Sequence, residues 1–325
     1  MKVALVYGGT STEQEASTLN AQFVEAALKR LGYRTDMIVY DGAMIERLRS
    51  AAPDAVFLCV QGKWHGDGTS QAVLDFLGLP YTGSGAMAAA IINNKIVCKE
   101  LFQYAGLRTP SWQVLSHADY KAEKYDFSPI GYPFVAKAPT QGGGNGIAFI
   151  KSSRDISKIE DVFSYDDPIL IEQFIPGLYT TAGFLTREGQ LTVFPSVLVI
   201  TGNPPPESEL NTYNGLSFTV CKSDFPEAVQ AEIEAVVRKA FEITRAKDYG
   251  RLDFIISKED GLPYLLEINA VPSLKPSSIF PQIALLYGID YDKLIETVLL
   301  NGLNNPFRNK RRGIAPGFLT GNERG

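Results

Sequence analysis

The sequence predicts an α/β protein in which a parallel, helix-containing part is followed by a part rich in antiparallel strands. Three observations lead to this fold class. Apolar strand-like runs alternate with stretches of helical spacing over residues 1–93, later runs are paired around turns, and residues 250–272 have the pattern of a β-hairpin. With 325 residues, 45% of them hydrophobic and 21% charged, the chain has room for two or three domains.

The first third justifies the parallel sheet. Residues 2–7 (KVALVY), 34–40 and 54–60 are strand-like runs, and the helical stretches between and after them cover residues 16–31, 45–51 and 70–77. Ligands collect at the carboxyl ends of parallel strands. Gly8 and Gly9 follow the first strand there, and residues 61–68 follow the third.

The remaining elements alternate less regularly. A helix over residues 87–104 carries Lys95, and strands are expected over residues 133–139, 146–152 and 166–174. A hairpin turns at residues 187–189 within 180–199, and residues 202–215, rich in Pro, Asn and Gly, look like one long mobile loop. Helices over 224–247 and 283–300 then flank the last hairpin, and the polar, basic tail from residue 305 is expected to fray.

The last hairpin places carboxylates opposite each other. A turn centred on Asp260 pairs Asp253 with Glu267 and Arg251 with Asn269, so that all four point to one face. Ile255 and Leu265 would share this face, whereas Phe254, Ile256, Leu266 and Ile268 would face the other way. Like charges opposite each other are destabilising. A solvated face with Arg251 as counter-ion is one explanation; a Mg²⁺ site with oxygen ligands explains the strongly apolar strands better.

A glycine-rich segment joins two of the predicted strands. Residues 136–150 read AKAPTQGGGNGIAFI, with Lys137 on the entering strand. Glycines let a backbone approach phosphates closely, as a flap closing over a ligand would. The segment has no Gly-Lys-Ser/Thr and no following helix, so it is not a Walker A loop. Viewed alone, an idle hairpin loop explains it equally well.

Composition excludes several classes of function. The net charge of −5 argues against nucleic acid as a partner. No apolar stretch approaches the roughly 20 residues of a membrane span. Three widely spaced cysteines suit a reducing compartment, so we expect a cytoplasmic protein. No Ser-His-Asp or Cys-His arrangement indicates a covalent hydrolase.

The order of the motifs resembles the D-alanine–D-alanine ligase family of ATP-grasp enzymes. The matching pieces are GGTSTE (8–13), PYTGSG (80–85) before Lys95, Lys137 with its glycine flap, EQFIPG (172–177), RLDF (251–254) with LLEIN (265–269), and YGIDYDKLIE (287–296). The resemblance runs from Val3 to about Leu300. It implies an ATP-grasp fold: a doubly wound parallel α/β domain (1–93), a central subdomain (94–176), a C-terminal subdomain (177–305) and a flexible tail (306–325).

The resemblance also implies an activity and its residues. The family phosphorylates a carboxylate with ATP, and an amine then displaces phosphate to give an amide; lysines and metals neutralise the transferring group. ATP would lie between the central and C-terminal sheets, in contact with Lys95, Lys137, Gly142, Gly143, Gly144, Gly146, Glu172, Gln173, Phe174, Ile175 and Tyr179. Two Mg²⁺ ions would be held by Asp253, Glu267 and Asn269.

The same resemblance assigns the substrate groups. Arg251 would stabilise the oxyanion of the tetrahedral intermediate, Glu13 would hold the first substrate's ammonium group, and Ser278 would contact the second substrate. The other positions expected near the amino-acid substrates are Gln61, Tyr213, Ser273 and Lys275. The partners implied are small amino-acid-type molecules and a second copy of the chain, in a homodimer formed through the N-terminal domain.

Departures from the family pattern gather around the amino-acid substrates. The flap has Gly143 in place of a serine, the loop with Tyr213 lacks the adjacent lysine, and Ala270-Val-Pro-Ser273-Leu-Lys275 replaces Thr-x-Pro-Gly-Met-Thr. Gln61-Gly-Lys-Trp-His65-Gly66-Asp67-Gly68 stands for His-Gly-x-x-Gly-Glu-Asp-Gly. On the nucleotide side, Tyr179 replaces a ribose-binding glutamate.

These departures lead to three hypotheses. The first is a carboxylate–amine ligase that joins something other than two D-alanines, because losing groups that hydrogen-bond a polar substrate changes specificity strongly. The second is an ordinary D-alanine–D-alanine ligase. The third, from another class, is a non-catalytic nucleotide-binding protein, which the retained metal triad argues against. A nicotinamide dehydrogenase is disfavoured because GGTSTE lacks Gly-x-Gly-x-x-Gly.

Overall fold

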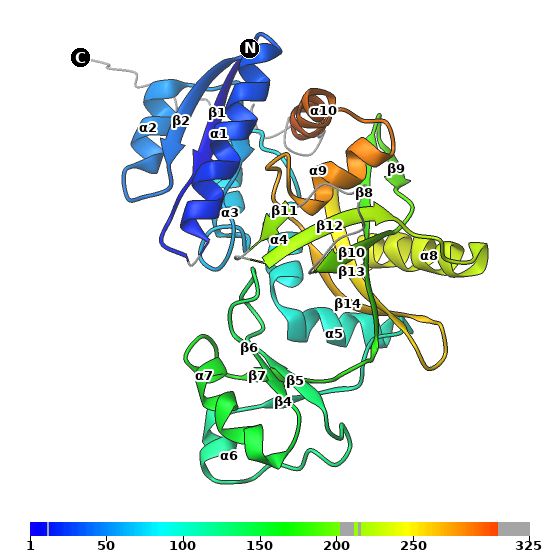
Figure 1. Ribbon diagram of the computed structural model, residues 1–325. Helices are drawn as coiled ribbons and strands as arrows, with labels where there is room; N and C mark the ends of the chain where they lie inside the picture. Colours follow the sequence, from blue (N-terminus) through cyan, green and yellow to red (C-terminus); the bar gives the residue numbers. More distant parts are fainter. Residues whose placement is uncertain (12, 202–210, 214–215, 305–325) are drawn as a thin grey trace.

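The computed structural model describes residues 1–11, 13–201, 211–213 and 216–304. Within these ranges, only the backbone is described for residues 201, 211–213 and 216–218. Within these ranges the chain forms three sheets in consecutive parts of the sequence (Figure 1). The predicted fold class is confirmed: a parallel α/β part comes first, and two antiparallel sheets follow. The predicted tail, residues 305–325, lies outside the described residues.

The N-terminal sheet is parallel and has the order β2-β1-β3. Its strands are β1 (Lys2–Tyr7), β2 (Arg34–Val39) and β3 (Ala55–Leu58), and its helices are α1 (Gln14–Arg30), α2 (Met44–Ala51) and α3 (Thr69–Leu77). The spacing that predicts α1 is that of its buried side chains, which include Asn20, Val24, Ala27 and Leu28. All six elements lie where the sequence predicts them, within two residues at most ends.

The predicted helix over 87–104 is wrong as a single element. The chain forms α4 (Ala86–Asn93) and α5 (Lys95–Tyr104), separated by Asn94 in an extended conformation with φ −105° and ψ 106°. The Asn94 side chain accepts hydrogen bonds from the backbone N–H groups of Ile96 and Val97, which is a helix N-cap. The break makes Lys95 the first residue of a new helix, beside the glycine-rich segment.

The central sheet is antiparallel, with the order β4-β7-β5-β6. It contains the three predicted strands, β5 (Phe134–Lys137), β6 (Ile147–Ile150) and β7 (Ile169–Gln173), and an edge strand that the sequence did not reveal, β4 (Trp112–Leu115). Three short helical segments were also missed: α6 (His117–Lys121), η1 (Ser153–Lys158) and α7 (Ile159–Phe163). They cover one face of the sheet around Phe134, Ile150 and Ile171.

The C-terminal sheet has the order β11-β12-β10-β8-β13-β14, and β9 pairs with β8. Its strands are β8 (Gly177–Arg187), β9 (Gln190–Val193), β10 (Val197–Thr201), β11 (Asn211–Tyr213), β12 (Leu216–Lys222), β13 (Tyr249–Ser257) and β14 (Pro263–Asn269). The hairpin at 187–189 is confirmed. The loop predicted over 202–215 instead contains strand β11, and residues 202–210 and 214–215 lie outside the described residues.

Helices cover both faces of the C-terminal sheet. The predicted helix 224–247 is α8 (Glu227–Thr244), which packs on the face with Leu252, Phe254 and Leu265. The closing helix predicted over 283–300 is wrong as one element, because the chain forms α9 (Ile279–Leu286) and α10 (Tyr291–Leu303). Gly288 between them has φ +82°, and Asp290 caps α10 by accepting the N–H of Lys293. Helices α9 and α10 share a core with α1 and join this sheet to the N-terminal part (Figure 1).

The register of the last hairpin is confirmed where the carboxylates lie. Asp253 pairs with Glu267, and Arg251 with Asn269. Beyond them a β-bulge shifts the register, so that Phe254 pairs with Leu265. The prediction that Leu265 shares the carboxylate face is therefore wrong: Leu265 is buried in the core beneath α8.

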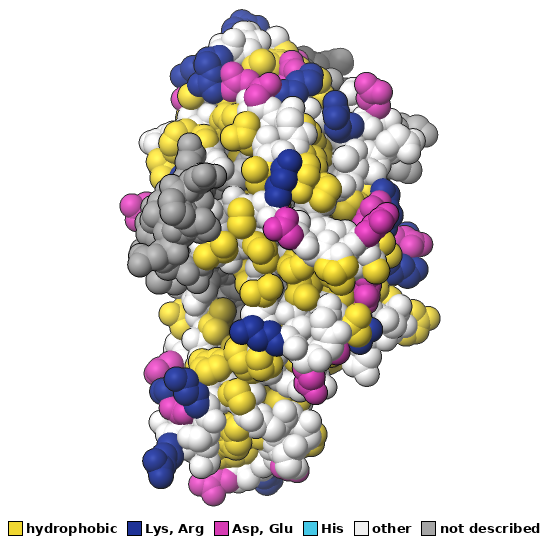
Figure 2. Space-filling model, turned by 45° about the vertical axis from the view of Figure 1, so that its right-hand side comes forward, with side chains coloured by type: hydrophobic (Ala, Val, Ile, Leu, Met, Phe, Trp, Pro, Cys, Tyr) yellow, Lys and Arg dark blue, Asp and Glu magenta, His cyan; other side chains and the backbone are white. Residues whose placement is uncertain are grey.

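One face of the molecule carries charged side chains of both signs (Figure 2). Figure 2 shows Lys, Arg, Asp and Glu side chains scattered over one face of the molecule, with apolar side chains between them. Among the described residues, no helix combines the length and the apolar character that crossing a bilayer requires.

Gly250, on the first strand of the carboxylate hairpin, has no room for a side chain. A Cβ on Gly250 would lie 2.4 Å from Cζ of Phe184 and 2.8 Å from the carbonyl oxygen of Asn269. We expect Gly250→Ala to lower the free energy of unfolding by about 1–3 kcal/mol through overpacking. In the control Gly42→Ala, a Cβ has no neighbour within 4 Å, and the change should stay within about 0.5 kcal/mol. Urea unfolding followed by circular dichroism measures both; equal effects would contradict the packing.

Candidate functional site

The carboxylate of Asp253 is surrounded by donors rather than exposed to repulsion. Arg251 donates two hydrogen bonds to it, from Nε to Oδ1 at 2.8 Å and from Nη2 to Oδ2 at 2.7 Å. Thr181 Oγ1 on the neighbouring strand β8 donates to Oδ1 at 2.7 Å, and Asn269 Nδ2 donates to Oδ2 at 3.2 Å. The side chain is 1% exposed. The charge of Arg251 and the hydrogen bonds from Thr181 and Asn269 compensate for the burial of this carboxylate.

The opposite carboxylate, Glu267, is balanced from another part of the molecule. Lys95 Nζ lies 3.3 Å from Glu267 Oε2, and it also donates to the carbonyl oxygen of Gln141 at 2.6 Å. Burial alone would raise the pKa of Glu267, but Lys95, Lys137 and Arg251 together lower it to about 2. Its side chain remains 31% exposed, whereas that of Asp253 is closed off. The hairpin therefore offers a ligand one accessible carboxylate that is ionised near neutral pH.

A second ionic cluster lies on the central sheet. Glu172 on β7 accepts from Lys137 on β5 with one oxygen and contacts the ammonium group of Lys99 on α5 with the other. Lys99 and Glu172 are almost fully buried. Sequence reasoning missed Lys99, although it follows Lys95 by four residues and therefore lies on the same face of α5.

The glycine-rich segment closes toward Glu13. A Cβ on Gly142 would lie 3.1 Å from Glu13 Oε2, and one on Gly62 would lie 2.8 Å from the same atom. Burial raises the pKa of Glu13, Lys95 lowers it and Glu267 raises it, so Glu13 is within electrostatic reach of both. In the flap itself, Gly143, Gly144 and Gly146 have φ of +66°, +80° and +65°, a backbone region that favours glycine.

His65 holds the loop that carries Glu13. Its Nε2 accepts the backbone N–H of Thr10 at 3.0 Å, and its Nδ1 lies 2.6 Å from the carbonyl oxygen of Lys63. These contacts place the proton on Nδ1 and join the loop after β1 to the loop after β3. This role of His65 could not be predicted from the sequence, because its two partners are backbone groups from different loops.

Residues expected near the second substrate form one turn before α9. Ser278 Oγ donates to Ser273 Oγ at 2.8 Å, and the backbone N–H of Ser278 donates to the carbonyl oxygen of Lys275 at 2.7 Å. Gln61 lies across from this turn and donates from Nε2 to the carbonyl oxygen of Val271 at 3.1 Å. Tyr213 lies on β11, and its side chain is outside the described part of the chain.

The segment that joins the central and C-terminal sheets contains the remaining predicted residues. Gln173 ends β7, and the ring of Phe174 meets that of Phe149 edge-on at 4.9 Å between centroids. Ile175 follows, half-buried. Tyr179 on β8 points to the carboxylate hairpin: burial raises its pKa strongly, and the charge of Asp253 and a hydrogen bond to it act in the same direction.

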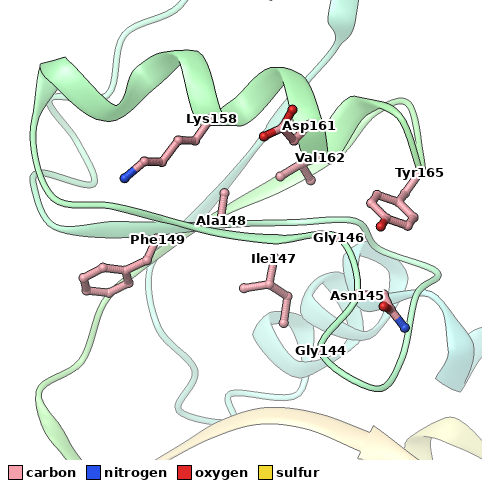
Figure 3. Close-up of a pocket in the computed structure, with 10 residues that line it drawn as sticks. All are labelled: Gly144, Asn145, Gly146, Ile147, Ala148, Phe149, Lys158, Asp161, Val162 and Tyr165. Atoms are coloured by element: carbon pink, nitrogen blue, oxygen red, sulfur yellow. The ribbon is translucent and has the colours of Figure 1, made fainter. Parts of the chain in front are cut away.

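A hollow on the central sheet lies beside these clusters. Figure 3 shows its lining, in which Ile147 and Phe149 from β6 point to one side of the strand and Lys158, Asp161 and Tyr165 lie on the other. The flap residues Gly144, Asn145 and Gly146 close one end. The lining contains apolar surface next to the flap and none of the charged residues of the two clusters. Of the residues predicted to contact the nucleotide, the structure places Lys95, Lys137 and Tyr179 next to the carboxylate hairpin, with Thr181 and Lys99 as unforeseen partners.

The lowered pKa of Glu267 predicts a pH dependence. A carboxyl group with a pKa of about 2 in the folded protein and an ordinary value of 4.5 stabilises the fold above about pH 4.5, and this contribution is lost as the pH falls toward 2. The difference in unfolding free energy between the wild type and Glu267→Gln should therefore shrink from pH 6 to pH 3 in urea titrations. In a Lys95→Met background this loss should occur at higher pH. If the difference in unfolding free energy between the wild type and Glu267→Gln does not change with pH, the charge of Glu267 does not stabilise the fold.

Comparison with known proteins agrees with this arrangement. Residues 101–300 match the family model described as the D-ala D-ala ligase C-terminus. The D-alanine–D-alanine ligase of Pelotomaculum thermopropionicum is 31% identical over 312 residues, covering 94% of this chain and 98% of that protein. The corresponding ligase of Geobacter sulfurreducens is 32% identical over 305 residues, covering 92% of this chain and 93% of that protein.

Solved structures show the same fold. The D-alanine–D-alanine ligase of Bacillus anthracis, solved in complex with ATP, has a TM-score of 0.79 and 25% identity, and the match covers 96% of this chain and 99% of that one. The enzyme of Coxiella burnetii has a TM-score of 0.81 at 20% identity, with 97% and 96% covered, which supports the fold alone. The chain therefore belongs to the D-alanine–D-alanine ligase family and is an ATP-grasp ligase of the ADP-forming type.

Proposed function

We propose that this ligase uses ATP to activate the carboxylate of one D-alanine and joins it to the amine of a second, through an acyl phosphate. The observation that carries the proposal is the convergence of Lys95, Lys137 and Arg251 on the carboxylate hairpin. Three cations from separate elements at one place suit a transferring phosphoryl group, whose charge must be neutralised as it moves.

The choice of D-alanine rests on the relatives. Proteins named D-alanine–D-alanine ligase align over more than nine-tenths of the chain at 30–32% identity. This supports the pair of D-alanines better than the first hypothesis drawn from the sequence, in which the altered residues around the substrates indicated a different pair.

The donor set fits a hard divalent cation. Asp253, Glu267 and Asn269 supply only carboxylate and amide ligands, which are the groups that Mg²⁺ prefers. Glu267 is the accessible ligand, whereas Asp253 would have to exchange a hydrogen bond from Arg251 or Asn269 for the ion. The charges of the site also favour a bound cation. The number of cationic side chains equals the number of carboxylates, so their formal charges cancel before a nucleotide binds. The cationic side chains are Lys95, Lys99, Lys137 and Arg251, and the carboxylates are Glu13, Glu172, Asp253 and Glu267. Mg²⁺ held by these three residues would offset the charge of the triphosphate.

The chain's own groups then have distinct tasks. Lys95 and Lys137 bind and neutralise the phosphates, and the flap glycines offer backbone N–H groups over them. Glu13 holds the ammonium group of the first substrate, and Arg251 stabilises the oxyanion formed when the amine attacks the acyl phosphate. The apolar surface of Ile147, Phe149 and Phe174 suits the adenine ring.

One observation favours a second candidate function, a ligase with a different amine substrate. The hydroxyl of Ser278, expected to contact that substrate, donates to Ser273 within its own turn. A site whose polar group is used internally loses the hydrogen bond on which rejection of other substrates depends.

Product analysis separates the two candidates. Incubation with ATP, Mg²⁺ and D-alanine, followed by mass spectrometry, should yield D-alanyl-D-alanine together with ADP. The same assay with D-alanine and a panel of other amino acids or hydroxy acids should give slower reactions. A mixed product formed much faster than D-alanyl-D-alanine would favour the second candidate, and no ADP with any pair would contradict both.

The carboxylate hairpin should be indispensable for turnover. Asp253→Asn and Glu267→Gln each remove one charged oxygen ligand, so we expect kcat to fall about a hundredfold or more. Asp260→Asn, in the exposed turn of the same hairpin, is the matched control and should leave kcat within about twofold of the wild type. Steady-state ADP release measures all three variants, and an active Asp253→Asn enzyme would refute the assignment.

A further inference from the structure

Lys99 is a buried cation to which the reaction proposed above gives no task. Its side chain is 1% exposed, and its ammonium group contacts the carboxylate of Glu172 and donates to Thr109 Oγ1. Placing a lysine in such an environment is costly without a charged partner. Glu172 supplies that charge, but the same carboxylate also binds Lys137.

The sharing of Glu172 determines the local charge. One carboxylate between two ammonium groups leaves an excess of one positive charge. Of the two lysines, Lys137 reaches the surface, with 14% of its side chain exposed, whereas Lys99 is sealed in. Within the group of Lys99, Glu172 and Lys137, the cation that a ligand can reach is therefore Lys137.

The cluster is also tied to the carboxylate hairpin. Thr109 Oγ1 donates to the carbonyl oxygen of Leu265 at 2.7 Å, and the N–H of Leu265 donates to the carbonyl oxygen of Arg108 at 2.9 Å. Leu265 lies at the β-bulge, two residues before Glu267. Contacts thus run from Lys137 on the central sheet, through Glu172, Lys99 and Thr109, to the strand that carries Glu267.

We propose that Lys99 is a positioning residue that occupies one oxygen of Glu172 and thereby keeps Lys137 from being neutralised, so that Lys137 presents a net positive charge to the polyphosphate of the nucleotide. This role rests on the proposed function of Lys137 as a phosphate-binding lysine. Without Lys99, the carboxylate of Glu172 forms a one-to-one pair with Lys137, and the phosphates meet a neutral pair instead of a cation.

Binding of inorganic tripolyphosphate tests this role without involving the adenine ring. Isothermal titration at fixed Mg²⁺ should show affinity about tenfold weaker in Lys99→Met than in the wild type. Lys99→Arg, which keeps the charge, should recover most of it. The matched control is Thr109→Val, which changes the contacts of Lys99 without changing charge and should alter the affinity less than about threefold.

The double variant separates electrostatics from packing. In Lys99→Met/Glu172→Gln the carboxylate that neutralises Lys137 is also removed, so tripolyphosphate affinity should return toward the wild-type value. If Lys99 served the fold alone, Lys99→Met would lower Tm and leave the tripolyphosphate affinity of the folded protein unchanged. The proposal would be overturned by an unchanged affinity in Lys99→Met, and also by a weakened affinity that the added Glu172→Gln change does not restore.

Two further variants test the proposal if Lys99→Met does not fold and test the role of Lys137 separately. If Lys99→Met does not fold, Glu172→Gln alone decides: the proposal expects undiminished or tighter tripolyphosphate binding, and weaker binding would contradict it. Lys137→Met tests the premise separately, because unchanged binding in that variant would remove Lys137 from the phosphate site and refute the site assignment rather than the role of Lys99.

Discussion

Two carboxylates facing each other across an antiparallel strand pair set the constraint on which this structure depends. Asp253 and Glu267 lie on adjacent strands in direct register, where like charges repel. The molecule compensates them from separate elements: Arg251 from the same strand, Lys95 from the start of a helix, and Lys137 from another sheet. Because these cations come from different parts of the chain, balancing the hairpin also brings the central and C-terminal sheets together.

Local features of the chain can be understood as consequences of this requirement. The break at Asn94 begins a new helix at Lys95 and directs its ammonium group between Glu267 and the Gln141 carbonyl of the flap. The bulge after Asp253 turns Leu265 into the core while leaving Glu267 opposite Asp253. Bulges re-aim side chains in this way next to active sites.

The sequence predicted the parts that depend on short-range periodicity. Counting from Asp260 yielded the pairing of Asp253 with Glu267, because side chains alternate with a period of two and a hairpin fixes which residues face each other. The bulge was not predictable, since one extra residue leaves the apolar pattern intact. The break at Asn94 was hidden because asparagine inside a helical pattern and asparagine as an N-cap look alike until the tertiary contacts of Lys95 are known.

Contacts between residues distant in sequence were the other part of the site that could not be predicted. Thr181 and His65 act through residues distant in sequence, so neither composition nor spacing connects them with the site. Lys99 shares a helix face with Lys95, but the spacing does not reveal its partner Glu172, which lies on another element. The resemblance placed the charged residues in one site but gave no account of how their charges are shared, which only the contacts reveal.

In the site proposed for this ligase, the facing carboxylates and their cations bind the phosphates and the metal of the nucleotide. A crystal structure with a non-hydrolysable ATP analogue and Mn²⁺ in place of Mg²⁺ tests it most directly. We expect an anomalous scattering peak bounded by Asp253, Glu267 and Asn269, with the β- and γ-phosphates beside Lys95 and Lys137. A peak elsewhere, or phosphates bound away from these lysines, would contradict it.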